Sequence, residues 1–102
     1  MRDRWREWRS ERRRSARART GLRRACPCCG YLTLEGDPGD YDVCKVCFWE
    51  DDPVQLRDPT YEGGANTVSL EQARINYRRH GAAELRFKDA VRPPLPGELP
   101  ET

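Results

Sequence analysis

The hydrophobic and polar positions of the chain predict a short β-hairpin in its first half. Residues 31–34, Tyr-Leu-Thr-Leu, have the composition of a short strand, and residues 41–43, Tyr-Asp-Val, form the expected partner. The segment between them, residues 35–40, is dense in glycine, proline and aspartate, which are turn-forming residues. We therefore expect the two strands to pair across that turn.

The clearest helical pattern covers residues 70–79. Apolar residues recur at helical spacing from Leu70 to Tyr77. Ser69 stands in the N-cap position, where its hydroxyl can accept a hydrogen bond from the first turn. Gly81 follows three basic residues and marks the end of the helix.

The remaining segments carry weaker patterns. Residues 53–68 contain prolines and glycines and predict an irregular connection, whereas residues 82–91 predict a second short helix. The proline-rich residues 93–102 predict an extended tail. The pattern as a whole predicts a small α+β domain over residues 24–92, with a hairpin followed by one or two short helices.

The composition leaves room for only a thin core. The 102 residues are 36% hydrophobic and 35% charged, so we expect one small domain. Such a domain needs a covalent or metal cross-link to be stable, and its five cysteines can provide one. No apolar run approaches the roughly 20 residues that cross a bilayer, and no segment resembles a signal peptide. We therefore expect a cytoplasmic protein without membrane contact.

The charge is divided unevenly along the chain. Residues 1–25 hold eleven arginines against three acidic residues, a net charge of +8, whereas residues 26–102 carry a net charge of −6. Residues 1–23 are therefore predicted to be a basic, disordered or frayed-helical arm. Such an arm stays solvated, docks on the acidic body, or contacts nucleic-acid phosphates. In the last case the candidate contacts are Arg9, Arg12, Arg13, Arg14, Arg17 and Arg19.

Glu50, Asp51 and Asp52 form a run of acidic residues. Oxygen ligands suit calcium and magnesium, but the run lacks the alternating spacing of a calcium loop. We expect a solvated charged turn, with a cation site or a dock for the arm as alternatives.

The most informative feature is a set of four cysteines in two C-x2-C pairs, separated by fourteen residues. They are Cys26, Cys29, Cys44 and Cys47. Two intervening residues let both thiolates of a pair face one point about 2.3 Å away, which is typical of a structural zinc site. Pro27 and Gly30 suit a tight turn in the first pair, whereas Phe48 stands where glycine often follows the second. The pattern predicts a zinc-ribbon-like hairpin with two knuckles and one Zn²⁺ per chain.

The spacing leaves other uses of these thiols open. An iron site and thiol redox chemistry share it, while disulfides are disfavoured because the cysteine count is odd and no secretory signal is present. Cys28 is left over, and it is a small buried residue, an alternate metal ligand or a reactive thiol. His80, the single histidine, suits the negative end of the predicted helix, and we do not assign it to the metal.

Two stretches, CPCCGY at residues 26–31 and YDVCKVCFWEDD at residues 41–52, resemble the bacterial cysteine-rich CPCC family. The resemblance continues through GGAN at 63–66, Ser-Leu at 69–70 and VRPP at 91–94, and it excludes the arm. It implies a small cysteine-rich domain that is expected to bind metal, and it implies no particular activity.

No catalytic set is evident in the sequence. It contains no glycine-rich phosphate loop, serine nucleophile elbow or histidine–carboxylate arrangement, and four-cysteine zinc sites are usually closed. We therefore expect a small intracellular zinc-binding module that acts in protein interaction and is not an enzyme. The alternatives are a nucleic-acid-binding protein that uses the arm, and a thiol redox protein.

Overall fold

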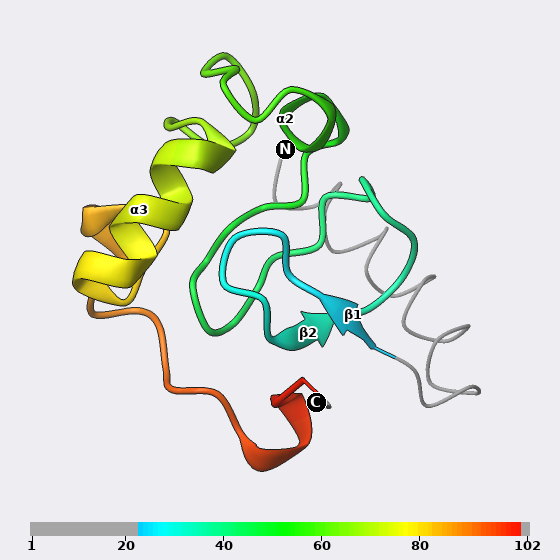
Figure 1. Ribbon diagram of the computed structural model, residues 1–102, viewed down its shortest axis with the longest axis vertical. Helices are drawn as coiled ribbons and strands as arrows, with labels where there is room; N and C mark the ends of the chain where they lie inside the picture. The colour runs from blue at the N-terminus through cyan, green and yellow to red at the C-terminus, as the bar shows by residue number, and fades with distance from the viewer. Residues whose placement is uncertain (1–22, 101–102) are drawn as a thin grey trace.

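The computed structural model describes residues 23–100, which form two helices, a two-stranded sheet and two turns of 3₁₀ helix (Figure 1). The strands are β1 (Arg24–Ala25) and β2 (Leu32–Leu34), the helices are α2 (Pro53–Arg57) and α3 (Leu70–His80), and the 3₁₀ turns are η1 (Leu85–Phe87) and η2 (Pro96–Glu98). In Figure 1, α3 lies to one side of the sheet, and the chain after η1 returns so that η2 contacts β2. The predicted small α+β fold is confirmed. Within the described residues, no helix combines the length and the apolar character needed to cross a membrane.

The predicted partner of the strand at residues 31–34 is wrong. β2 pairs antiparallel with β1, while residues 41–43 contribute only a single antiparallel bridge between Val43 and Glu50. The physical reason is that each cysteine pair occupies a tight turn of its own. The residues that flank each turn therefore pair with each other, and residues 35–40 only connect the two units.

The register of the sheet contains a β-bulge. Arg24 lies opposite Leu34 and Ala25 lies opposite Leu32, so two residues of β1 face three residues of β2. Thr33 is the extra residue, and it has no partner on β1. A bulge of this kind bends the strand and changes the direction of a side chain.

The predicted helix over 70–79 is confirmed as α3. Ser69 Oγ accepts a hydrogen bond from the main-chain N–H of Gln72 at 3.1 Å, as an N-cap residue should. Gly81 ends the helix with a φ of +78°, and its N–H donates to the carbonyl oxygen of Tyr77 at 2.8 Å.

The expectation of an irregular connection over 53–68 is wrong for its first turn, which forms α2. Asp52 is the N-cap, and its Oδ1 accepts hydrogen bonds from the main-chain N–H groups of Val54 at 2.7 Å and Gln55 at 3.3 Å. Pro53 occupies the first helical position, where its missing N–H costs no hydrogen bond. The Asp52–Pro53 pair is therefore a sequence signal for the start of a helix.

A buried polar network holds the connection between α2 and α3. Gln55 and Asn66 are 0% and 3% exposed. Asn66 Nδ2 donates to Gln55 Oε1 and to the main-chain oxygen of Glu50, both at 2.8 Å. Gln55 Nε2 in turn donates to the main-chain oxygens of Tyr61 and Val68. These side chains replace main-chain hydrogen bonds that an irregular segment would otherwise leave unmade.

The expected solvated acidic turn at residues 50–52 is wrong, because all three residues are less than 9% exposed. Asp51 Oδ2 accepts hydrogen bonds from the Arg24 guanidinium at 2.5 Å and from the Gly39 N–H at 2.9 Å. Asp52 caps α2. Both aspartates are therefore part of the framework.

The C-terminal part departs from the expectation in two places. Only the three residues of η1 are helical within 82–91, and Leu85 is 59% exposed, so a longer helix would have little apolar surface to bury. The expected extended tail is interrupted by η2, where the buried Glu98 accepts two hydrogen bonds from Arg92 at 2.8 and 2.7 Å. The domain boundaries at 23/24 and 92/93 stay predictions.

The core is small and contains four of the five cysteines. Its buried members are Cys26, Cys28, Leu34, Cys44, Val46, Cys47, Trp49, Leu70, Ala73 and Ala83. The cysteine sulfur atoms therefore occupy the space that a larger domain fills with aliphatic side chains.

Candidate metal centre

The first cysteine pair lies in a turn between β1 and β2. The N–H of Gly30 donates to the carbonyl oxygen of Cys26 at 2.8 Å, and the N–H of Cys26 donates to the carbonyl oxygen of Tyr31 at 2.9 Å. Gly30 has a φ of +85°, a conformation that glycine adopts without steric cost. This turn directs Cys26 and Cys29 to the same side.

The second cysteine pair repeats the same turn. The N–H of Phe48 donates to the carbonyl oxygen of Cys44 at 2.8 Å, and the N–H of Cys44 donates to that of Trp49 at 3.0 Å. Phe48 occupies the position of Gly30 and has a φ of +69° despite its side chain. The turn itself, rather than a glycine, is therefore what the two pairs have in common.

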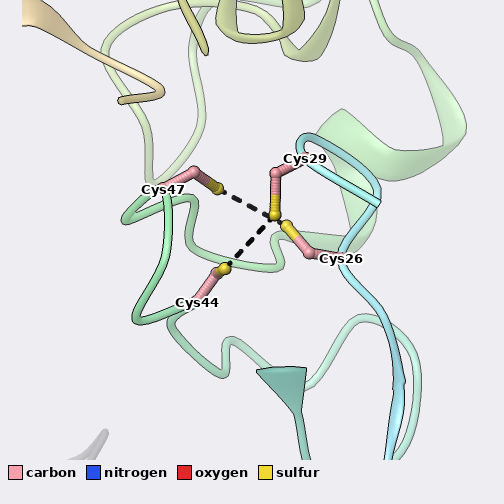
Figure 2. Close-up of side chains that lie close together, drawn as sticks. All are labelled: Cys26, Cys29, Cys44 and Cys47. Atoms are coloured by element: carbon pink, nitrogen blue, oxygen red, sulfur yellow. Dashed lines mark hydrogen bonds between the residues drawn. The ribbon is translucent and has the colours of Figure 1, made fainter. Parts of the chain in front are cut away.

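The four sulfur atoms of the two turns converge on one point, as Figure 2 shows. The Sγ atoms of Cys26 and Cys47 are 3.6 Å apart, as are those of Cys29 and Cys44. All four lie within 4.8 Å of one another. A tetrahedral zinc ion with Zn–S bonds of about 2.3 Å separates its ligands by about 3.8 Å, whereas a disulfide needs about 2.05 Å. The arrangement fits a metal site and contains no disulfide.

The sulfur atoms also affect one another's protonation. Contacts with the other cysteines, Cys26 foremost, together with burial raise the pKa of the Cys47 thiol far above its ordinary value. Contacts with Cys26 and the other two cysteines lower the pKa of Cys44, and the hydroxyl of Thr33 adds to this effect. Four thiolates at these distances repel one another unless a cation compensates their charge.

Within residues 23–100, a main-chain N–H and a threonine hydroxyl reach the sulfur atoms from outside the set of four. The main-chain N–H of Cys28 points at Cys26 Sγ at 3.4 Å, and the hydroxyl of Thr33 donates to Cys44 Sγ at 2.9 Å. Donors of this kind orient ligands and offset their negative charge. The sequence analysis missed Thr33, because composition does not tell where a hydroxyl in a strand points.

Helix α3 and the segment after it hold both turns in place. Arg74 Nε donates to the carbonyl oxygen of Pro27 at 2.9 Å in the first turn. The N–H of Ala83 donates to the carbonyl oxygen of Cys47 at 2.8 Å in the second. Helix α3 and the segment after it thus connect the two cysteine pairs.

The other candidate residues are not members of this cluster. Cys28 is buried beside it, and contact with its thiol is one of the causes that raise the pKa of Cys47, but its sulfur is not one of the four atoms that lie together. His80 is exposed at the end of α3. The six arginines proposed for nucleic-acid contacts, which are Arg9, Arg12, Arg13, Arg14, Arg17 and Arg19, lie outside the described residues.

Comparison with protein families matches residues 24–98 to the family described as Cysteine-rich CPCC. The match contains both cysteine turns, both helices and η2. Comparison with individually curated proteins finds no match.

Proposed function

Because the chain belongs to the cysteine-rich CPCC family, we propose that it is a small module whose fold depends on one structural zinc ion and whose task is to bind another protein. Cys26, Cys29, Cys44 and Cys47 would hold the ion. The observation that carries the proposal is the convergence of their sulfur atoms at a spacing that suits tetrahedral zinc.

The energetics support a structural role for the ion. Zinc binding contributes about 10–16 kcal/mol in small zinc-finger peptides at neutral pH, and whole domains are stable by about 5–15 kcal/mol. The core of this protein is thin and contains three of the four proposed ligands, while the fourth, Cys29, packs against it. The free energy lost with the ion would therefore be as large as the whole free energy of unfolding of a typical domain.

The closed set of ligands supports a role in interaction and not in catalysis. Four sulfur ligands fill a tetrahedral shell, so the ion has no position for water or substrate. Reduced cysteines also suit a reducing compartment such as the cytoplasm. What the module offers a partner is then the surface of the framework that the ion holds together.

A pair of cysteine variants tests the proposal. Cys44→Ser removes a proposed ligand, whereas Cys28→Ser is the matched control, since both residues are buried and only Cys44 belongs to the cluster. We expect Cys28→Ser to retain one zinc ion per chain and the wild-type circular dichroism spectrum. We expect Cys44→Ser to lose both, as the wild type does in a strong chelator. A folded, metal-free wild-type protein would rule the proposal out.

Nucleic-acid binding is a second candidate function, and it is supported by the net charge of +8 over residues 1–25. A salt titration of labelled RNA and DNA tests it on the full-length protein. The comparison is between the wild type and a variant in which the six candidate arginines of the arm are glutamine. Equal binding by both proteins would eliminate this candidate.

A further inference from the structure

The two cysteine turns match in their main-chain hydrogen bonds but differ in what reaches their sulfur atoms. In the first turn, the N–H of Cys28, two residues after Cys26, donates to Cys26 Sγ at 3.4 Å. The corresponding donor in the second turn would be the N–H of Val46, and it makes no such bond to Cys44 among the described residues. The hydroxyl of Thr33 donates to Cys44 Sγ instead, at 2.9 Å.

This hydroxyl comes from β2, the strand that follows the first cysteine turn, and the bulge in the sheet brings it to the second turn. Thr33 is the residue of β2 that has no partner on β1. Its N–H donates to the carbonyl oxygen of Tyr31 at 2.9 Å, which holds the bulge against the first cysteine turn. A bulge frees one side chain from the alternation of its strand. Here it turns a hydroxyl toward the sulfur of the second turn.

The position of Thr33 gives its hydroxyl a particular importance. Cys44 is 0% exposed, so solvent does not reach its sulfur atom. Thr33 itself is half-buried and lines a cavity of about 310 Å³ together with Val43 and Lys45. The hydroxyl therefore supplies this buried sulfur with a hydrogen bond that water cannot.

We propose that Thr33 is a positioning residue of the metal centre, and that its hydroxyl stabilises the thiolate of Cys44 and fixes its direction toward the ion. The proposal rests on the proposed function. Four thiolates around a divalent ion carry a formal charge of −2 in a buried site, and each donor to sulfur offsets part of that charge. The bond also ties the two cysteine turns to each other independently of the ion.

The test compares three variants of the full-length protein. Thr33→Val has nearly the shape of threonine but no hydroxyl, whereas Thr33→Ser keeps the hydroxyl. Thr60→Val is the matched control, because Thr60 is exposed and its hydroxyl donates to Asp58, away from the sulfur atoms. The measurements are the Zn²⁺ affinity, by competition with a chromophoric chelator, and the sulfur-to-metal charge-transfer band of the Co²⁺-loaded protein.

We expect Thr33→Val to weaken zinc binding about tenfold or more, as loss of a hydrogen bond to a ligand does, and to shift the charge-transfer band. Thr33→Ser and Thr60→Val should stay near the wild type in both measurements. A Thr33→Val protein with wild-type affinity and spectrum would overturn the inference, as would an equal loss in Thr33→Ser or Thr60→Val. A wild-type protein that binds neither metal would instead overturn the proposed function.

Discussion

Phe48 is the residue in which the demands of the site and of the backbone conflict most. Its φ of +69° lies in the left-handed region, which costs a residue with a side chain about 1–2 kcal/mol. The ring compensates by packing against Phe87, with 5.1 Å between the ring centroids. The sequence revealed the missing glycine, and the structure reveals that the turn forms without it.

We predict that the order of stability at this position is Phe, then Gly, then Ala. Phe48→Ala keeps the strained conformation and loses the contact with Phe87, which should lower the free energy of unfolding by about 2 kcal/mol. Phe48→Gly loses the same contact but relieves the strain, so it should recover about 1 kcal/mol of that loss. Denaturant unfolding of the zinc-loaded proteins measures the difference. An alanine variant that is at least as stable as the glycine variant would contradict this explanation.

At the scale of elements, the sequence predicted correctly the helix whose start, apolar face and end are all marked by local residues. Helix α3 carries an N-cap serine, an apolar face and a terminal glycine, and all three features act where the sequence places them. Helix α2 has only five residues and only one strong signal, its Asp52–Pro53 start, so composition alone suggested a loop. The strands pair as they do because each cysteine turn is tight enough for its own flanking residues to meet. The C-x2-C spacing alone does not predict this.

The connection between α2 and α3 depends on a close approach that only glycine permits. A Cβ atom on Gly64 would lie 2.5 Å from Asp52 Oδ2 and 2.7 Å from Gln55 Oε1. Both of these oxygens belong to buried side chains and accept hydrogen bonds from main-chain N–H groups. Neither side chain can therefore move away without losing a hydrogen bond.

We therefore predict that Gly64→Ala lowers the free energy of unfolding by about 2–3 kcal/mol. Gly97→Ala is the matched control, because a Cβ atom added there would meet no atom within 4 Å beyond its chain neighbours, and it should change stability by less than about 0.5 kcal/mol. Thermal unfolding in the presence of zinc distinguishes the two. Equal midpoints for both variants would mean that the loop yields easily.

At the scale of the whole molecule, the chain after α3 closes the fold through an ion pair. Arg92 holds the carboxylate of Glu98 in two hydrogen bonds, and Arg23 approaches the same carboxylate at 3.8 Å. The hydrogen bonds from Arg92 lower the pKa of Glu98 below its ordinary value of 4.5. The contact between Arg23 and Glu98 joins the two ends of the described chain.

The lowered pKa sets the direction of a pH effect. Glu98 contributes its stability fully above the ordinary pKa, and this contribution is lost as the pH falls through the lowered pKa of the folded protein. The wild type should therefore be more stable than Glu98→Gln at pH 7, and the difference should shrink below about pH 4.5. Protonation of the thiols affects both proteins alike. Glu62→Gln, at an exposed position, is the control, and a difference for Glu98→Gln that stays constant with pH would contradict the assignment.

The four-cysteine cluster was the part of the molecule that the sequence predicted best, because C-x2-C spacing restricts where two sulfur atoms can point. What the sequence did not contain was the environment of those sulfur atoms. The hydroxyl of Thr33, the guanidinium of Arg74 and the main-chain N–H of Ala83 reach the cysteine turns only because the chain folds back on itself.

Zinc K-edge X-ray absorption on the full-length protein, purified without added metal, tests the central claim most directly. We predict one zinc ion per chain with four sulfur neighbours at about 2.3 Å and no nitrogen or oxygen neighbour. A protein without zinc, or a zinc ion with a mixed shell of sulfur and lighter atoms, would contradict the account.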